Sequence, residues 1–116
     1  MKQIKIQIVD YGMGNLQSVR NALEHLHCEV ELSGDSNKLD DADALILPGV
    51  GAFPEAMNNL RKCNLVEPLR RAVLDEGKPL LGICLGMQLL ADSSDEHGFC
   101  RGLSLIPGQV RKIPVA

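Results

Sequence analysis

Residues Lys78–Leu90, with the sequence KPLLGICLGMQLL, decide the fold of this chain. The apolar run before Cys84 predicts a buried strand, and the apolar spacing after it predicts a helix. Cys84 stands between them, with Gly82 two residues before it and Gly86 two residues after it. This is the G-x-nucleophile-x-G pattern of a nucleophile elbow, a sharp strand-to-helix turn that presents a reactive side chain.

Each residue of this pattern has a physical reason to stand where it does. An elbow brings both flanking positions close to other backbone, so Gly82 and Gly86 supply room that a side chain would fill. At the start of a helix, unpaired amides and the helix dipole favour the thiolate, which is the nucleophilic form of Cys84. The alternative is a small buried hydrophobic residue at a tight turn. The coincidence of both glycines with a strand and a helix favours the nucleophile.

Outward from the elbow, strands and helices are expected to alternate. Apolar runs predict strands at residues 4–9, 29–32, 44–47 and 79–83, with further short strands among residues 103–113 after a polar loop at 92–98. Helical spacing of apolar residues begins near residues 16, 53, 65 and 85. This order predicts an α/β fold, a doubly wound and mostly parallel sheet with helices on both faces. The length of 116 residues corresponds to a single domain, residues 1–116.

Composition excludes several classes of function. A net charge of −3, with acids and bases interspersed, does not favour a nucleic-acid or membrane-surface partner. No apolar stretch reaches the length of a signal peptide or a membrane span, so we expect a cytoplasmic protein. The four cysteines form no C-x-x-C pair and have no zinc-ligand spacing, so we expect reduced thiols and no metal. Nothing in the sequence predicts a cofactor.

Two further glycine turns are expected beside the elbow, because the carboxyl ends of parallel strands meet at one edge of a sheet. Asp10–Leu16 begins like a dinucleotide fingerprint, but Gln17 occupies the place of its third glycine, which disfavours nucleotide binding. The alternative is a turn whose polar edge faces a partner. Pro48–Phe53 places bare backbone amides at the same edge. Alone it would be an ordinary glycine-rich loop, and its place beside Cys84 favours a loop that cradles an oxyanion.

A thiolate beside backbone amides is equipped for acyl transfer. The sulfur attacks a carbonyl carbon, and the amide of Leu85 together with the glycine loop stabilises the oxyanion that forms. The product of this attack is a thioester on Cys84. Gln88 lies one helical turn after Cys84 and therefore on the same side of that helix.

These motifs carry a resemblance to a known family. Residues 82–88, GICLGMQ, resemble the nucleophile signature of class I glutamine amidotransferases. Three other stretches are similar, within that family, to the glutaminase subunits of imidazole glycerol phosphate synthase in histidine biosynthesis: DYGMGNL at 10–16, PGVGAF at 48–53 and IPG at 106–108. The resemblance runs over essentially the whole chain.

The resemblance implies a flavodoxin-like amidotransferase fold and the hydrolysis of glutamine to glutamate, without a cofactor. It implies that ammonia passes to a partner, a (β/α)8-barrel synthase subunit that makes imidazole glycerol phosphate and AICAR. The family's roles fall on the following positions: the nucleophile on Cys84; the oxyanion hole on Val50, Gly51 and Leu85; glutamine binding on Gly49, Gln88 and Glu96; and the partner interface on the exposed turn with Tyr11, Gly12, Met13 and Asn15.

The resemblance also implies a catalytic base that these residues do not include. Family members carry the histidine and glutamate of a Cys-His-Glu triad in a further C-terminal portion, and this sequence ends at Ala116. His25, His27 and His97 match no base position in the family pattern. We therefore expect little or no glutamine turnover by these 116 residues alone.

Two alternatives remain open on the sequence. Without a triad, the domain would be a binding or regulatory module that keeps the fold and the docking surface but not the catalysis. The signature around Cys84 is also shared more widely than the one around Gly12. An amidotransferase that feeds another ammonia-using synthase therefore fits as well.

Overall fold

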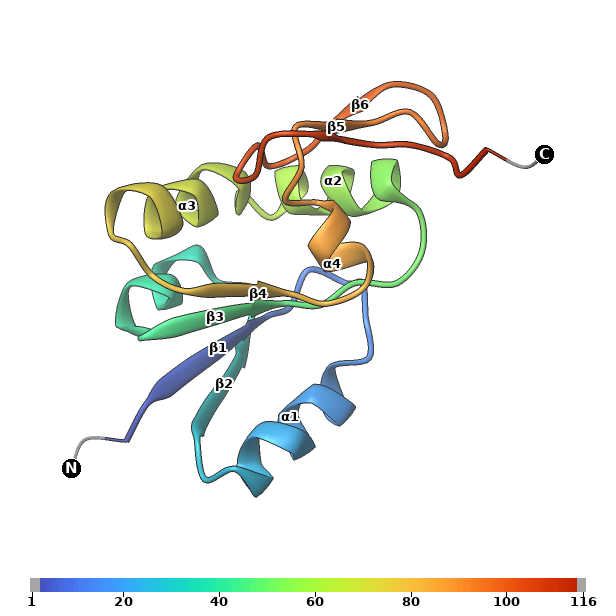
Figure 1. The fold of residues 1–116 in the computed structure, drawn as a ribbon. Coiled ribbons are helices and arrows are strands. Elements are labelled where there is room, and N and C mark those ends of the chain that lie inside the picture. The colour runs from blue at the N-terminus through green and yellow to red at the C-terminus, as the bar shows by residue number, and fades with distance from the viewer. Residues whose placement is uncertain (1–2, 115–116) are drawn as a thin grey trace.

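A four-stranded parallel sheet forms the centre of the molecule (Figure 1). The computed structural model describes residues 3–114. The strand order is β2-β1-β3-β4, and each neighbouring pair is parallel. The bounds are β1 (Lys5–Val9), β2 (Glu29–Ser33), β3 (Ala44–Leu47) and β4 (Leu80–Gly82). These strands agree with the expected runs to within two residues at each end, and the predicted α/β class with a mostly parallel sheet is confirmed.

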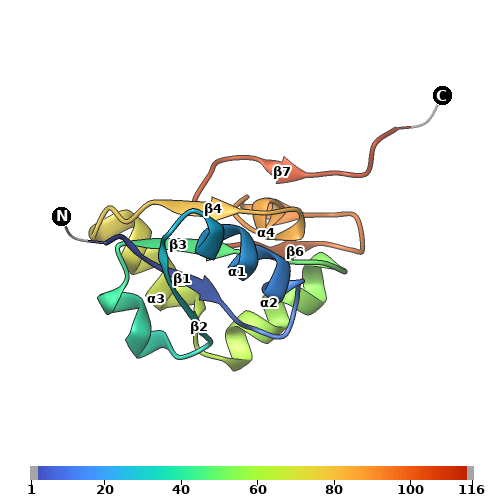
Figure 2. The ribbon, with the colours of Figure 1, turned by 90° about the horizontal axis from the view of Figure 1, so that it is seen from below.

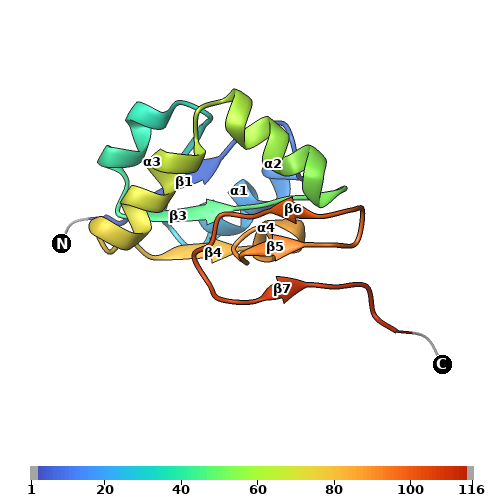
Figure 3. The same ribbon diagram turned by 90° about the horizontal axis from the view of Figure 1, so that it is seen from above.

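Helices cover both faces of this sheet. Helix α1 (Leu16–His25) lies on one face, as Figure 2 shows from below. The opposite face carries α2 (Phe53–Lys62), α3 (Val66–Arg70) with its π-helical continuation η2 (Arg71–Asp75), and the 3-10 helix η1 (Ser36–Asp41), as Figure 3 shows from above. No helix within residues 3–114 is long and apolar enough to cross a membrane.

The main hydrophobic core lies on the face covered by α2 and α3. Apolar residues of β3, α2 and α3 are almost fully buried there, together with one residue at the end of the elbow helix and one from a later loop. These buried residues are Leu45, Leu47, Phe53, Met57, Leu60, Leu69, Leu89 and Leu103. On the other face, no residue of α1 is buried, although its apolar residues have the expected helical spacing. At the β4 edge, Leu81 is exposed. The sheet is therefore packed more closely on its α2 and α3 face.

A second, small sheet lies beyond the elbow helix (Figure 1). Its strands are β5 (Ser93–Ser94), β6 (Cys100–Arg101) and β7 (Gln109–Val110), in the order β6-β5-β7. The expectation of a polar loop over residues 92–98 is wrong at Ser93 and Ser94, which are buried and paired on both sides. The expected strands among residues 103–113 reduce to β7. Polar composition misled here because the backbone of these serines is satisfied by strand pairing.

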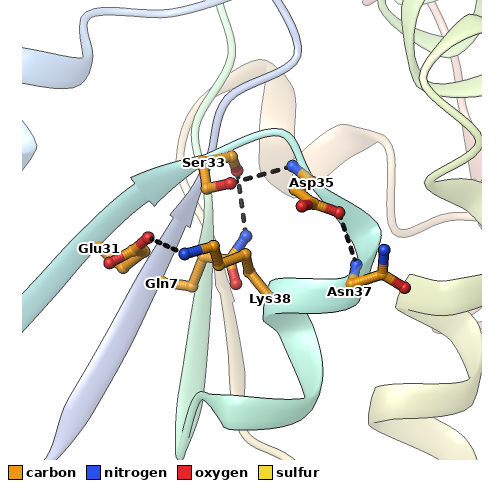
Figure 4. Close-up of polar contacts among 6 residues, drawn as sticks. All are labelled: Gln7, Glu31, Ser33, Asp35, Asn37 and Lys38. Carbon is orange, nitrogen blue, oxygen red and sulfur yellow. Dashed lines mark hydrogen bonds and ion pairs between the residues drawn. The ribbon is translucent and has the colours of Figure 1, made fainter.

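One polar side chain is buried within β1. Gln7 is 0 % exposed, and its Nε2 donates to the Ser33 carbonyl at 3.0 Å (Figure 4). Its Oε1 has no hydrogen-bond partner among the described residues. The neighbouring polar groups shown there hold the start of η1: the Asp35 amide donates to Ser33 Oγ, and Lys38 pairs with Glu31 at 3.1 Å. A buried acceptor without a partner costs stability.

We therefore expect Gln7→Met to raise the free energy of unfolding by about 1 kcal/mol. Methionine fills a similar volume without a polar atom, and the Ser33 carbonyl keeps the amide of Asp10 as a donor at 3.0 Å. Urea denaturation measures the change. Gln7→Glu is the matched control and should destabilise the chain, because it buries a carboxylate. A lower free energy of unfolding for Gln7→Met would contradict this prediction.

Candidate active site

Cys84 occupies a strained strand-to-helix turn. Strand β4 ends at Gly82, and helix α4 (Leu85–Gln88) begins directly after Cys84. The cysteine has φ 55° and ψ −120°, a conformation that non-glycine residues rarely adopt. Such strain persists only where the surrounding structure enforces it, and it is concentrated at functional sites. The elbow predicted from the sequence is therefore present.

The two glycines of the elbow are required by close backbone approach, as the sequence argument expects. A Cβ added to Gly82 would lie 2.7 Å from the Cα of Met87 and 2.8 Å from the carbonyl oxygen of Gly86. A Cβ added to Gly86 would overlap the carbonyl oxygen of Leu47 at the end of β3. Any side chain at either position would therefore displace backbone.

The amides at the start of α4 are engaged in hydrogen bonds, which differs from the sequence expectation. The Leu85 amide donates to the Gly49 carbonyl at 3.2 Å, and the Gly86 amide donates to the Ile83 carbonyl at 3.0 Å. Helix α4 is also a single turn of 4 residues. The expectation of unpaired amides beside Cys84 is therefore wrong in this conformation, because the elbow packs so closely on the glycine loop that the loop carbonyl takes the first donor.

A pocket of about 350 Å³ joins the elbow to the glycine loop. It is lined by Gly49, Val50, Gly51, Cys84, Leu85, Met87 and Gln88. Six of these residues were assigned roles in the sequence analysis, and the structure brings all six together around one pocket. Met87 is the seventh and was not predicted. It follows Cys84 by three residues, and this helical spacing is the signal that points to it.

Glu96 lies apart from this pocket. It is exposed in the segment between β5 and β6, and it is not among the pocket residues. The role of Glu96 in holding glutamine stays a prediction. The sequence's three histidines, His25, His27 and His97, are all outside the pocket as well. Within residues 3–114, no three or more His, Cys, Asp or Glu side chains come together in a group that could hold a metal ion.

The turn between β1 and α1 is less exposed than the sequence suggested. Tyr11 and Met13 are 3 % and 7 % exposed, so the expectation of an exposed turn is wrong for these two side chains. Gly12 and Asn15 are exposed, and Asn15 caps α1 by accepting from the Ser18 amide. Tyr11 is buried because its ring joins the main core, and its hydroxyl reaches across to donate to the Pro48 carbonyl at 2.6 Å. The contact of this turn with a partner stays a prediction.

Burial also fixes the protonation state of this tyrosine. It raises the pKa of Tyr11 far above the ordinary value, because the phenolate would lose its hydration. The hydroxyl therefore stays a neutral donor over the whole physiological range of pH.

Comparison with known proteins identifies the family. The sequence profile of "Glutamine amidotransferase class-I" matches residues 7–106, which include the elbow, the glycine loop and most of the central sheet. The chain belongs to the class I glutamine amidotransferases.

Two similar relatives both carry the name imidazole glycerol phosphate synthase subunit HisH. The protein from Geobacillus kaustophilus is 55% identical over 109 residues, which are 94% of this chain and 51% of that protein. The protein from Bacillus cereus is 51% identical over 111 residues, which are 96% of this chain and 53% of that protein. The chain spans about half the length of the curated relatives it matches.

A solved structure shares the fold. The crystal structure of a glutamine amidotransferase superposes with a TM-score of 0.77 at 23% identity, and the match covers 91% of this chain and 55% of that chain. At this identity the likeness concerns the fold. It agrees with the parallel sheet and the flanking helices, within which Cys84 follows the carboxyl end of β4.

Proposed function

We propose that this chain supplies the nucleophile side of a glutaminase site in a glutamine amidotransferase of histidine biosynthesis. The observation that carries the proposal is the meeting of a strained Cys84, the glycine loop and Gln88 around one pocket. Family membership and the names of the relatives support the choice of glutamine as substrate. Glu96 and Gly49 are proposed as further contacts to glutamine.

The proposed chemistry is acyl transfer. The Cys84 sulfur attacks the side-chain amide carbon of glutamine, and the carbonyl oxygen becomes an oxyanion. The amides of Val50, Gly51 and Leu85 are proposed to stabilise that charge. The oxyanion then collapses and the C–N bond breaks: the amide nitrogen takes up the proton that the Cys84 thiol gave up and leaves as ammonia, and a γ-glutamyl thioester remains on Cys84. Water then hydrolyses the thioester, which yields glutamate and restores the thiol.

The hydrogen bond from the Leu85 amide to the Gly49 carbonyl bears on this step. While that bond exists, the Leu85 amide is directed at the loop and not at a substrate oxygen. The oxyanion role proposed for Leu85 therefore requires this 3.2 Å contact to be exchanged for the substrate. Preorganised donors contribute most to catalysis when they face the charge that develops.

The proposed partner is a (β/α)8-barrel synthase subunit that receives the ammonia. The relatives are named as subunits of imidazole glycerol phosphate synthase, so a second subunit is the natural recipient. Exposed Gly12 and Asn15 lie in the turn proposed to face that subunit. Val50 and Met87, which are exposed and apolar, line the pocket beside Cys84 and are also available for contact.

The test is acylation by an activated substrate. In the γ-(4-nitrophenyl) ester of glutamate, the leaving group needs no proton, so attack by Cys84 does not depend on a base. We expect the chain to release about one equivalent of nitrophenolate and then to slow sharply, because no histidine lines the pocket to activate water. Mass spectrometry should place the glutamyl group on Cys84.

Two controls define the outcome of this experiment. Cys84→Ala should abolish the release, whereas Cys63→Ala should leave it unchanged, since Cys63 is exposed and outside the pocket. Release that survives in Cys84→Ala would refute the proposed function. Sustained hydrolysis of glutamine itself, lost in Cys84→Ser, would instead refute the expectation of little turnover by this chain.

A further inference from the structure

Tyr11 touches the glycine loop at the place where that loop meets the elbow. Its hydroxyl donates to the Pro48 carbonyl at 2.6 Å. A Cβ added to Gly49 would lie 2.6 Å from the same hydroxyl oxygen and 2.9 Å from the amide nitrogen of Gly86. The tyrosine hydroxyl and the start of α4 thus both crowd the position that a side chain at residue 49 would take.

The same turn holds the glycine loop at two more points. A Cβ added to Gly14 would lie 3.2 Å from the Pro48 Cβ and 3.3 Å from the Gly49 nitrogen. A Cβ added to Gly51 would lie 3.1 Å from the Met13 Cε. Only Tyr11 among these contacts makes a directional hydrogen bond to the loop. It is therefore the contact that fixes the orientation of a peptide group and not merely its position.

The planarity of the peptide bond carries this constraint toward Cys84. The Pro48 carbonyl and the Gly49 amide belong to one rigid plane, so a donor that fixes the first also fixes the direction of the second. The next carbonyl, that of Gly49, accepts from the Leu85 amide beside the nucleophile. Two consecutive peptide groups of the loop are thus held, one by Tyr11 and one by the elbow.

We propose that Tyr11 is a positioning residue for acyl transfer at Cys84: its hydroxyl fixes the Pro48–Gly49 peptide and so anchors the loop whose following amides, those of Val50 and Gly51, are to bind the substrate oxyanion. This inference rests on the proposed function. Tyr11 itself is buried, is absent from the pocket lining and touches no substrate, so it acts through the loop. Because burial raises the pKa of Tyr11 and keeps its hydroxyl protonated, its donation to the loop does not change at about pH 8.5, where a free thiol titrates.

The test compares two reactions of the same thiol in Tyr11→Phe. Acylation by the γ-(4-nitrophenyl) ester of glutamate needs an aimed oxyanion site, whereas alkylation by iodoacetamide needs only an accessible thiolate. We expect acylation of Cys84 to slow about tenfold, the equivalent of one lost hydrogen bond in the transition state. We expect alkylation to stay within about twofold, as for an unchanged thiol environment.

The control removes a different side-chain hydrogen bond, one made from strand β1 just before the turn that carries Tyr11. Gln7→Met loses the donation to the Ser33 carbonyl, outside the pocket, and should leave both rates unchanged. Unchanged acylation in Tyr11→Phe would overturn the proposal. An equal fall in acylation and alkylation would also overturn it, because that result indicates general damage to the elbow. If the unmutated chain shows no acylation that depends on Cys84, the proposed function fails first and this inference fails with it.

A second measurement applies if Tyr11→Phe does not fold. Tyr11 is the only tyrosine in the sequence, so growth with 3-fluorotyrosine labels this ring alone and keeps its hydroxyl. We expect its fluorine resonance to shift when Cys84 is acylated by the ester and to stay unchanged in Cys84→Ala treated in the same way. A resonance that does not respond to acylation would overturn the coupling between Tyr11 and the site.

Discussion

The reagent 6-diazo-5-oxo-L-norleucine, a diazoketone with the shape of glutamine, is expected to label Cys84 at least about 100-fold faster than Cys63. Both thiols are exposed, so accessibility alone does not separate them. Cys84 lies in a pocket that also presents Gln88 and the glycine loop, whereas Cys63 follows α2 on the surface. Binding of the glutamine-like part beside Cys84 would raise the effective concentration of the reagent there.

Iodoacetamide supplies the comparison for this experiment. It has no glutamine-like part, so it should modify both exposed cysteines and show no comparable preference. Peptide mass spectrometry after a series of reaction times measures both rates in one sample, and Cys84→Ala shows the background. Equal labelling of Cys84 and Cys63 by the diazoketone would mean that the pocket does not recognise glutamine. The elbow would then be a structural feature of a module without catalysis.

Some glycines of this chain have a positive φ and others do not. Among those that do not, we expect replacement of Gly86 by alanine to cause the largest loss of stability. The added methyl group would overlap the carbonyl oxygen of Leu47 and lie 2.8 Å from its carbonyl carbon, and both are backbone atoms of the central sheet. Backbone cannot move aside as a flexible side chain can, so α4 must shift away from β3. We expect the free energy of unfolding to fall by about 3 kcal/mol.

Gly98→Ala is the comparison for this steric effect, because it replaces a glycine that has backbone strain but no close neighbours. Gly98 has a φ of 86°, and nothing lies within 4 Å of a Cβ added there. Its substitution should cost only the conformational strain, about 1 kcal/mol. Urea denaturation of both variants gives the comparison, and the iodoacetamide rate at Cys84 shows whether the elbow has opened. A Gly86→Ala chain no less stable than Gly98→Ala would contradict the close approach of α4 and β3.

Much of the fold could be predicted because hydrophobic patterning is local information. The runs that became β1, β3 and β4 were recognisable as strands, and the rule that parallel strands share one carboxyl edge placed Gly49 beside Cys84. The elbow was recognisable for the same reason, since the glycine spacing is itself a local pattern, even though the backbone that crowds Gly86 is that of Leu47.

Other features could not be predicted because they depend on contacts between distant segments. The sequence suggested an exposed turn at Tyr11, yet its ring packs in the core and its hydroxyl bonds to a residue 37 positions away. Ser93 and Ser94 look like loop residues, yet β6 and β7 pair with them and bury them. Neither contact leaves a periodic pattern in the sequence.

The sequence by itself determined the α/β class, the elbow at Cys84 and the three turns that gather at one edge of the sheet. These follow from apolar periodicity and from the need for glycine where backbone approaches closely. Only the tertiary structure decided that the Leu85 amide is held by the Gly49 carbonyl and that Tyr11 anchors the adjacent peptide. Hydrogen bonds between segments far apart in the chain depend on how the sheet edge packs, which local patterning does not encode.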